Sequence, residues 1–545
     1  MIKIIIFSFI TNLMFYSYGH LIKLEKFTNK IDSFITRSIL GCILISFIAL
    51  TSNFLLPLDK IFNTLLLIFG LSFLAFIRKM NFKKKEFYYI FFSSIITASL
   101  LIYSNVNRPD AGLYHLPYVN FLNENKIIFG LSNINFRFGH ISIMQYLSAA
   151  NNNLLFKDVG IVIPLASIVT FFIIYFFNNV LKIFKKDKKK NLSNIFSLFI
   201  IIFISYKINR YSSFGNDAVA HLSFFYLISY LLNGKKIDLN FVFMISVFAF
   251  LNKPTMIIVF LFPLLIFIRN YKVKNFKLIY SLSSFLFIFW ILKNIIVSGC
   301  GIYPLKQTCF TNLSWTDIEE VKQESISGES WSKDWPNRKN KEISMKDYNK
   351  KFNWLSSWSN KHGIYLLNII VIYVLLILFV VYLILKKKNS DKITYRKNIF
   401  FKFSLFISIL GTIIFFIKFP LFRYGYSYLI SSLILIILMI FKEFSKIRLI
   451  KISKIIFCIC IIVISGKQVL RFTKNFKSDF LWPRIYSFNT NEKNDPKKVK
   501  LKKDFFVYQI VDNLCMYNKS PCTNYDLKKN IKVNNKFNYT FINLE

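Results

Sequence analysis

Residues 363–385 read GIYLLNIIVIYVLLILFVVYLIL, and Lys386, Lys387 and Lys388 follow directly. An apolar run of about 20 residues is long enough to cross the hydrocarbon core of a bilayer as an α-helix. Comparable apolar runs recur along the chain, which excludes a soluble enzyme, a coiled coil and a disordered chain. The sequence therefore predicts an all-α, polytopic membrane protein.

Apolar runs on both sides of this segment predict about fourteen transmembrane helices in total. The expected spans are 2–19, 38–56, 61–77, 87–104, 159–183, 193–208, 218–233, 238–251, 255–268, 278–298, 363–385, 398–417, 424–441 and 453–466. The stretch 238–268 has two interpretations, because Asn252-Lys253-Pro254 fits either a turn between two short helices or a kink within one.

The composition is apolar and strongly basic. Of the 545 residues, 54% are hydrophobic, and the formal net charge is +44. On a soluble chain such an excess of positive charge would indicate a nucleic-acid partner. Here the lysines form short clusters between apolar runs, for example at 83–85, 185–190 and 386–388, which is typical of cytoplasmic loops. We therefore expect membrane lipids, and no nucleic acid, around this chain.

Placing the basic connections in the cytoplasm gives a self-consistent topology. Two long connections, 105–158 and 299–362, then lie outside, and they interrupt a transmembrane domain that covers 1–466. The first of them contains helical stretches near 114–124 and 141–156 that are too polar to span a membrane. Residues 467–545 are expected to form a small external domain.

The cysteines agree with this sidedness. Cys300 with Cys309 and Cys515 with Cys522 form close pairs in segments predicted outside, where oxidation is permitted. Two local disulfides are the preferred interpretation, because no CxxC spacing supports the alternative of a zinc site. The other cysteines lie in apolar runs and are expected to be inert packing residues: Cys42, Cys458 and Cys460.

The first external loop opens with a group that could carry chemistry. Residues 107–117 read NRPDAGLYHLP, so Asp110 comes just after a membrane helix and His115 follows closely, with Arg137 and His140 further on. A carboxylate in a membrane-facing cleft can act as a general base on a hydroxyl, with histidine as its partner or as a phosphate contact. Alternatively, Asp110 caps the next helix and the histidines lie at the interface.

Other polar residues fall in connections on the same predicted side: Arg210, Asp217, His221, Lys253, Lys418 and Arg423. Together with Asp110, four of them are expected to meet near the outer leaflet: Asp217, Lys253, Lys418 and Arg423. Acidic and basic groups around one cleft suit a membrane-held substrate that carries a phosphate. The alternative for Lys418 and Arg423 is snorkelling at helix ends.

Many membrane helices, an acid directly after a helix in the first external loop, and an external C-terminal domain resemble the GT-C class of glycosyltransferases. The strings DAGLYHLP (110–117), SGCGIYP (298–304) and Cys515…Pro521-Cys522-Thr523 also resemble an uncharacterised family of bacterial multi-spanning membrane proteins taken to be GT-C-like. That second resemblance extends over nearly the whole chain.

The GT-C resemblance implies a polyprenyl-phosphate-linked sugar donor, with Asp110 as the first-loop catalytic acid. It also implies a glycan, lipid or protein acceptor and a place in the bacterial inner membrane, with the large loops and the C-terminus on the extracytoplasmic side. Members of this class commonly carry two neighbouring acids there, whereas this loop offers Asp110 alone. We therefore expect no cofactor and a mechanism without a metal ion, although a divalent metal remains an alternative.

The resulting hypothesis is an inverting glycosyltransferase. Residues expected to be catalytic are Asp110, His115 and Asp217, and residues expected to bind substrate are Arg137, His140, Arg210, His221, Lys253, Lys418 and Arg423. One alternative is a polymerase or ligase of lipid-linked glycans. Another is a transporter or flippase, although internal repeats and charges at mid-membrane, the usual signs of that class, are not evident.

Overall fold

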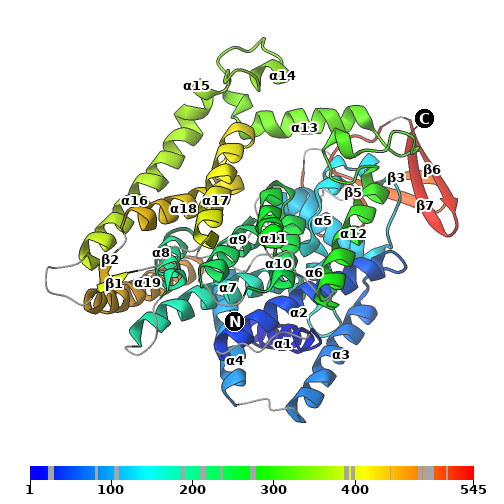
Figure 1. Ribbon diagram of the computed structural model, residues 1–545. Helices are drawn as coiled ribbons and strands as arrows, with labels where there is room; N and C mark the ends of the chain where they lie inside the picture. Colours follow the sequence, from blue (N-terminus) through cyan, green and yellow to red (C-terminus); the bar gives the residue numbers. More distant parts are fainter. Residues whose placement is uncertain are drawn as a thin grey trace.

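The computed structural model describes residues 1–22, 30–79, 84–102, 110–185, 191–208, 217–233, 237–269, 278–385, 392–394, 399–441, 443–476, 482, 496–510, 513–528 and 530–544. Within these ranges the chain is mostly helical, with short strands gathered near the C-terminus (Figure 1).

The α-helices are α1 (Ile2–Gly19), α2 (Lys30–Asn53), α3 (Lys60–Lys79), α4 (Lys84–Leu101), α5 (Leu116–Glu124), α6 (Ile143–Ala150), α7 (Ile163–Leu181), α8 (Leu192–Lys207), α9 (Asp217–Leu232), α10 (Leu239–Asn252), α11 (Leu261–Arg269), α12 (Leu278–Ser298), α13 (Ile318–Ser332), α14 (Met345–Tyr348), α15 (Leu355–Trp358), α16 (Ile364–Ile384), α17 (Ile399–Lys418), α18 (Phe422–Ile440) and α19 (Lys446–Asn475). The strands are β1 (Lys392–Thr394), β2 (Glu443–Ser445), β3 (Lys497–Lys502), β4 (Phe505–Gln509), β5 (Cys522–Thr523), β6 (Ile531–Lys536) and β7 (Tyr539–Leu544).

The protein is a predominantly helical membrane protein, but the expected count of fourteen spans is too high. Among the described residues, six helical segments are long and apolar enough to cross a membrane: Ile2–Gly19, Asp32–Asn53, Lys157–Phe184, Leu355–Ile384, Ile399–Lys418 and Phe422–Ile440. Six further apolar helical segments of 10–17 described residues do not reach that length, and two of them are parts of the longer helices α3 and α12. Hydropathy counts each apolar run as one span, so it also counted helices as short as α8, α9 and α10, which have 16, 16 and 14 residues.

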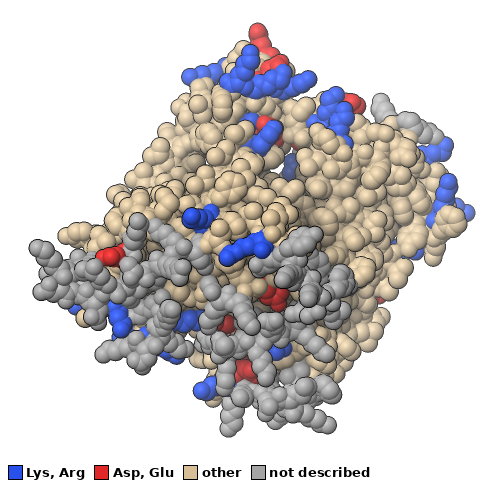
Figure 2. Space-filling model, in the orientation of Figure 1, with Lys and Arg blue, Asp and Glu red and all other residues tan. Residues whose placement is uncertain are grey.

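The side chains on the helix surfaces agree with a membrane location. On the face drawn in Figure 2, uncharged residues dominate the described surface, and charged side chains gather at its top edge, around the loop that carries α14. The helix α16 leaves Leu375 and Phe379 well exposed. An exposed apolar surface of this kind is stable against lipid and unstable against water.

The stretch 238–268 contains a break and not a kink. The helix α10 ends at Asn252, Lys253 is extended, and a 3₁₀ segment η6 (Pro254–Phe260) leads into α11. Proline lacks an N–H donor and disfavours helical geometry in the residue before it, which explains why the helix ends here. The break turns the Lys253 side chain out of the helical register.

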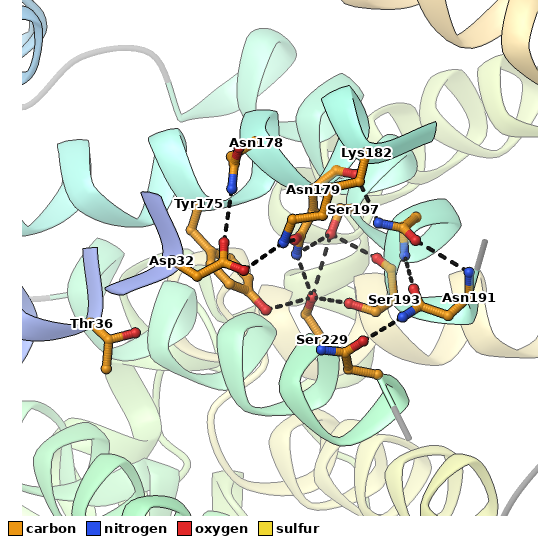
Figure 3. Close-up of polar contacts among 12 residues, drawn as sticks. Asp32, Thr36, Tyr175, Asn178, Asn179, Lys182, Asn191, Ser193, Ser197 and Ser229 are labelled. Atoms are coloured by element: carbon orange, nitrogen blue, oxygen red, sulfur yellow. Dashed lines mark hydrogen bonds and ion pairs between the residues drawn. The ribbon is translucent and has the colours of Figure 1, made fainter. Parts of the chain in front are cut away.

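Close backbone contact and buried hydrogen bonds hold the helices together. A Cβ at Gly41 of α2 would lie 1.7 Å from the Phe15 oxygen of α1, so only glycine allows this approach. A second contact, the buried polar cluster drawn in Figure 3, joins α2, α7, α8 and α9. In it Lys182 pairs with Asp32 at 2.7 Å, and Ser229 contacts Ser193 at 2.8 Å. Buried polar groups in a membrane protein need such internal partners.

The first long loop, residues 110–158, folds into helices in the region where the sequence predicts them. A π-helical turn η1 (Ala111–His115) continues into α5, and α6 begins with a capping box formed by Ser142 and Gln145. A 3₁₀ segment η3 (Phe136–His140) lies between them. The second long loop carries α13, α14 and α15, and its Trp358 donates a hydrogen bond to the Pro420 oxygen at 2.9 Å.

The C-terminal strands pack on the first long loop. The strands β3, β4 and β5 form one small sheet and β6 pairs with β7 in a hairpin. Backbone hydrogen bonds join Phe129 of the first loop to Thr540 and Ile542 of this hairpin, at 3.0 and 2.9 Å. The helix α19 continues through the boundary expected at 466 and ends at Asn475, so the apolar run and the following residues form one helix.

Both predicted disulfides are present, Cys300–Cys309 and Cys515–Cys522. The remaining cysteines are free: Cys42 and Cys460 are buried, whereas Cys458 is exposed on α19. The expectation that all three pack inside therefore fails for Cys458.

Candidate functional site

Two ion pairs lie together where α9, α10 and α18 meet the first long loop. Arg423, in the first turn of α18, places a guanidinium nitrogen 2.9 Å from a carboxylate oxygen of Asp110. Asp217, at the start of α9, lies 2.5 Å from the Nζ of Lys253. The Nζ of Lys253 also donates to the backbone oxygen of Arg423 at 3.0 Å. These contacts bring four residues that are distant in sequence into one cluster, which we call the charged cluster.

The geometry of Asp110 decides between the two interpretations of this residue. Its backbone is helical (φ −53°, ψ −33°), and its side chain makes no capping hydrogen bond. An N-cap residue has a non-helical backbone and accepts a hydrogen bond from the first turn. Asp110 therefore does not cap the helix, and its carboxylate is directed at Arg423.

A second arginine approaches the other carboxylate oxygen of Asp110. Arg137 of η3 has a guanidinium nitrogen 4.0 Å from the Asp110 carboxylate, and its Nε donates to the hydroxyl of Tyr525 at 2.7 Å. Tyr525 belongs to the C-terminal region, so that region contributes a residue next to the charged cluster. Arg137 also lies over the Tyr114 ring, 5.7 Å from its centre.

The cations of the charged cluster share an aromatic neighbour. The Nζ of Lys253 lies 4.2 Å from the ring centre of Tyr424, and Arg423 donates to the Tyr424 hydroxyl at 3.0 Å. A cation over an aromatic face is favoured when both are shielded from water. The alternative that Arg423 only snorkels to an interface is not supported, because its guanidinium has these specific partners.

His115 is buried beside the charged cluster in a defined tautomer. The Gln145 side-chain oxygen accepts from the backbone N–H of Ser142 at 3.0 Å, which leaves the Gln145 amide NH₂ facing His115 Nδ1 at 2.5 Å. Nδ1 must then accept, so the proton lies on Nε2. Burial lowers the pKa of His115 to about 4, against the opposite effect of the nearby Asp110 and Asp217 charges. His115 is therefore neutral near pH 7.

His221, which the sequence predicts to bind substrate, is instead a buried contact between two helices. It is fully buried, its Nε2 donates to the Arg423 backbone oxygen at 3.0 Å, and its Nδ1 contacts the Ser427 hydroxyl at 2.7 Å. These contacts join α9 to α18. His221 thus holds the backbone of Arg423 and offers no free group to a substrate.

Two of the expected binding residues pair elsewhere, and a third cannot be placed. Lys418 lies 3.3 Å from Glu329 of α13, and His140 lies 3.7 Å from Glu324 of the same helix. The expectation that Lys418 joins the charged cluster is therefore wrong, because the second long loop supplies a nearer carboxylate. Arg210 lies outside the described residues.

The disulfide loop between Cys515 and Cys522 supports the segment after Asp110. The backbone N–H of Met516 donates to the Gly112 oxygen at 2.9 Å. A Cβ at Gly112 would lie 2.4 Å from the Met516 sulfur, so this contact depends on glycine. The charged cluster therefore rests on the C-terminal region as well as on the helices.

Three of these neighbours were not expected from the sequence: Gln145, Tyr424 and Tyr525. Only Gln145 had a local signal, since the Ser-x-x-Gln spacing of residues 142–145 is that of a capping box. Tyr525 reaches Arg137 across 388 positions of sequence, which no local pattern reveals.

The charge and exposure of the site favour a phosphate-bearing ligand. Three cations, Arg137, Lys253 and Arg423, surround two carboxylates, so one positive charge is in excess. The Asp110 and Asp217 side chains are each 29% exposed, so a ligand can reach them. In the described parts of the chain, no three His, Cys, Asp or Glu side chains lie close enough to share a metal ion.

Comparisons with known proteins give one match. Neither the curated proteins nor the solved structures contain a match to the chain. The family model for a domain of unknown function, DUF8201, matches residues 1–430, which include all four residues of the charged cluster. The chain therefore belongs to the DUF8201 family.

Proposed function

We propose that this protein is a glycosyltransferase that moves a sugar from a polyprenyl-phosphate-linked donor to an acceptor hydroxyl at the outer face of the bacterial inner membrane. The observation that carries the proposal is the position of Asp110 between Arg423 and Arg137, in a partly exposed site at the ends of membrane helices. This arrangement combines a carboxylate, which can accept a proton, with cations that can hold a phosphate.

The donor phosphate competes with Asp110 for the arginine. Arginine binds carboxylates and phosphates through the same fork of N–H groups. When the phosphate enters, Arg423 exchanges its 2.9 Å contact with Asp110 for the phosphate oxygens, and Lys253 adds a second positive charge. The exchange frees the Asp110 carboxylate only when a donor is bound, so the base becomes available once the sugar is in the site.

The transfer itself needs one proton acceptor and one stabilised leaving group. Asp110 takes the proton of the acceptor hydroxyl, and the hydroxyl oxygen forms a bond to the anomeric carbon of the sugar. The bond between that carbon and the phosphate oxygen breaks, and both of its electrons leave with the lipid phosphate. The additional negative charge on the phosphate is stabilised by Arg423 and Lys253. The attack comes from the face opposite the leaving phosphate, so the product has the inverted configuration.

A polar recess near the far end of α5 offers space for an acceptor glycan. It has a volume of 610 Å³ and is lined by side chains that include Asn120, Asn123, Glu124 and Asn152. Amide and carboxylate groups are suited to the hydroxyls of a sugar, and cavities of about 300–1,000 Å³ hold small ligands. Because η1 continues directly into α5, one helical stretch leads from Asp110 to the recess. The same recess would serve a polymerase or ligase of lipid-linked glycans.

The test is transfer of labelled sugar from a polyprenyl-phosphate donor in membranes that contain the wild type or Asp110→Asn. The matched control is Asp347→Asn, which changes an exposed carboxylate of the second long loop in the same way. We expect Asp110→Asn to lose transfer by at least about a hundredfold, as general-base removal does, and the control to retain it. Transfer by Asp110→Asn at the wild-type rate would refute the role of Asp110. Uptake of the donor lipid without sugar transfer would favour the transporter.

A further inference from the structure

The hairpin formed by β6 and β7 has an exposed aromatic side chain in its turn. Lys536 pairs with Tyr539, and the two residues between them, Phe537 and Asn538, have φ angles of 50° and 64°. Positive φ at both central residues is preferred by Asn, Asp and Gly and is uncommon for a bulky residue. The Phe537 side chain is 93% exposed, so packing inside the protein does not offset this backbone cost.

This turn lies beside the end of a membrane span. The hydroxyl of Tyr539 donates to the backbone oxygen of Phe54 at 2.9 Å, and Phe54 directly follows the membrane-spanning segment Asp32–Asn53 of α2. The Cα atoms of Phe537 and Tyr539 are at most about 7 Å apart, because only two residues separate them along the chain. Figure 1 shows the hairpin at one edge of the molecule. Phe537 therefore lies near the level at which α2 leaves the bilayer.

The exposed side chains around this point have the composition of a membrane interface. Leu55 is 72% exposed, and Ile61 in the first turn of α3 is 64% exposed. The Nζ of Lys126 lies 4.4 Å from the ring centre of Tyr539, and Lys536 is exposed at the turn. Apolar and aromatic side chains that enter the acyl region, with lysines that reach the headgroups, are typical of protein segments at a bilayer surface.

The hairpin is held at this position by the backbone as well as by Tyr539. The N–H of Ile127 donates to the Asn53 oxygen at 3.0 Å, and the N–H of Phe129 donates to the Thr540 oxygen at 3.0 Å. The segment 127–129 thus joins the end of α2 to the hairpin. A single exposed apolar side chain needs no explanation on a soluble surface. Here the fixed position beside a membrane span indicates what covers the ring.

We propose that Phe537 anchors the C-terminal hairpin in the bilayer, with its ring at the boundary between acyl chains and headgroups and with Lys536 directed to the lipid phosphates. The leaflet is the one at this end of α2, which is the outer leaflet in the topology predicted from the sequence. The anchor ties the first long loop to the membrane surface through Phe129. It does not depend on the proposed function.

The test is the accessibility of a spin label in the full-length protein in lipid nanodiscs. The label is attached to Phe537→Cys in a Cys458→Ser background, because Cys458 is exposed. Electron paramagnetic resonance measures contact of the label with O₂, which concentrates in the bilayer, and with a nickel chelate, which stays in water. Phe379→Cys on α16 is the reference for lipid, and Glu342→Cys in the second long loop is the reference for water.

We expect the label at 537 to have more contact with O₂ and less contact with nickel than the label at 342. Contact with nickel equal to that at 342 would overturn the proposal, because the turn would lie in water. Low contact with both reagents would also overturn it, because the turn would then pack against a second protein copy. If Phe537→Cys does not fold, Asn538→Cys places the label on the other residue of the turn.

Hydrogen exchange in nanodiscs adds a second measurement. Phe537→Asp should speed amide exchange in the β6–β7 hairpin, because a carboxylate does not enter the acyl region. Aspartate adopts positive φ more readily than phenylalanine, so the faster exchange would not come from backbone strain. Phe537→Trp is the matched control, since it keeps an aromatic ring suited to the interface. Equal exchange in the two variants would show that the ring does not anchor the hairpin.

Discussion

The Nζ of Lys253 lies 3.0 Å from the backbone oxygen of Arg423. Lys253 pairs with Asp217 and Arg423 pairs with Asp110, so the cation of the first ion pair also holds the backbone of the second. Asp110 and Asp217 are therefore not independent. A change at either ion pair is transmitted to the other through the start of α18. Because of this coupling, a change in the free energy of one ion pair also changes that of the other.

The first prediction concerns this coupling. Lys253→Met should lower stability by about 2 kcal/mol, because it leaves Asp217 without its cation in a largely buried site. Adding Asp217→Asn to Lys253→Met should restore part of that loss, because it removes the unpaired charge. Thermal unfolding of the two variants in detergent measures the difference. A double variant less stable than Lys253→Met would contradict the pairing.

The second prediction concerns pH and His115. Burial lowers the folded-state pKa of His115 to about 4, below its ordinary value of 6.5, so the folded protein binds fewer protons than the unfolded chain between these values. Stability contributed by the neutral imidazole is present above pH 6.5 and is lost as the pH falls towards 4, by at most about 3 kcal/mol.

We therefore expect His115→Gln to unfold with a smaller dependence on pH than the wild type between pH 7 and pH 5. Unfolding temperatures at both pH values measure the effect. Parallel curves for the wild type and His115→Gln would show that His115 is not buried in the neutral form.

The third prediction concerns the disulfide loop. Gly112→Ala should reduce stability by about 1–3 kcal/mol, because its Cβ would lie 2.4 Å from the Met516 sulfur. Met516→Ala in the same chain should recover part of the loss. Gly328→Ala is the matched control: it meets nothing within 4 Å and lies within α13, where alanine is the better helix former. Equal unfolding temperatures for Gly112→Ala and Gly328→Ala would disprove the contact.

The fourth prediction uses the buried polar cluster of Figure 3. Lys182→Met removes the cation that pairs with Asp32 at 2.7 Å, leaves only the Asn178 amide beside that carboxylate among the described residues, and should lower stability by about 2 kcal/mol. At matched amounts of folded protein, its transfer rate should equal that of the wild type, because Lys182 makes no contact with the charged cluster. A specific loss of transfer would reveal coupling between the two polar regions and would support the transport alternative.

The sequence predicted all four members of the charged cluster, together with a fifth residue, Lys418, that lies elsewhere. Asp110, Asp217, Lys253 and Arg423 each fall at a helix end, and alternation of helices placed these ends together. Lys418 also falls at a helix end, yet it pairs with Glu329 and not with the charged cluster. Helix ends can be found from local hydropathy, whereas the partner of a charged side chain depends on packing between distant segments.

The predicted number of transmembrane helices was wrong for a related reason. The sequence left two interpretations of residues 238–268 open, and the structure shows the break at Asn252-Lys253-Pro254, where proline acts locally on the backbone. Whether the helix on either side of this break is long enough to span a bilayer depends on where that helix ends. Packing against neighbouring helices determines that position. The contribution of Tyr525 could not be predicted either, since its position next to Arg137 requires the whole C-terminal region to be folded.

The hairpin that pairs with Phe129 also determines when the site can be completed during synthesis. Asn133 in the first long loop donates to Ile542, a residue 409 positions later in the chain. All four members of the charged cluster leave the ribosome well before this partner exists. The first loop therefore lacks part of its support until translation has reached the hairpin. A chain that terminates before residue 540 would contain every residue of the charged cluster and still lack the support that orders it.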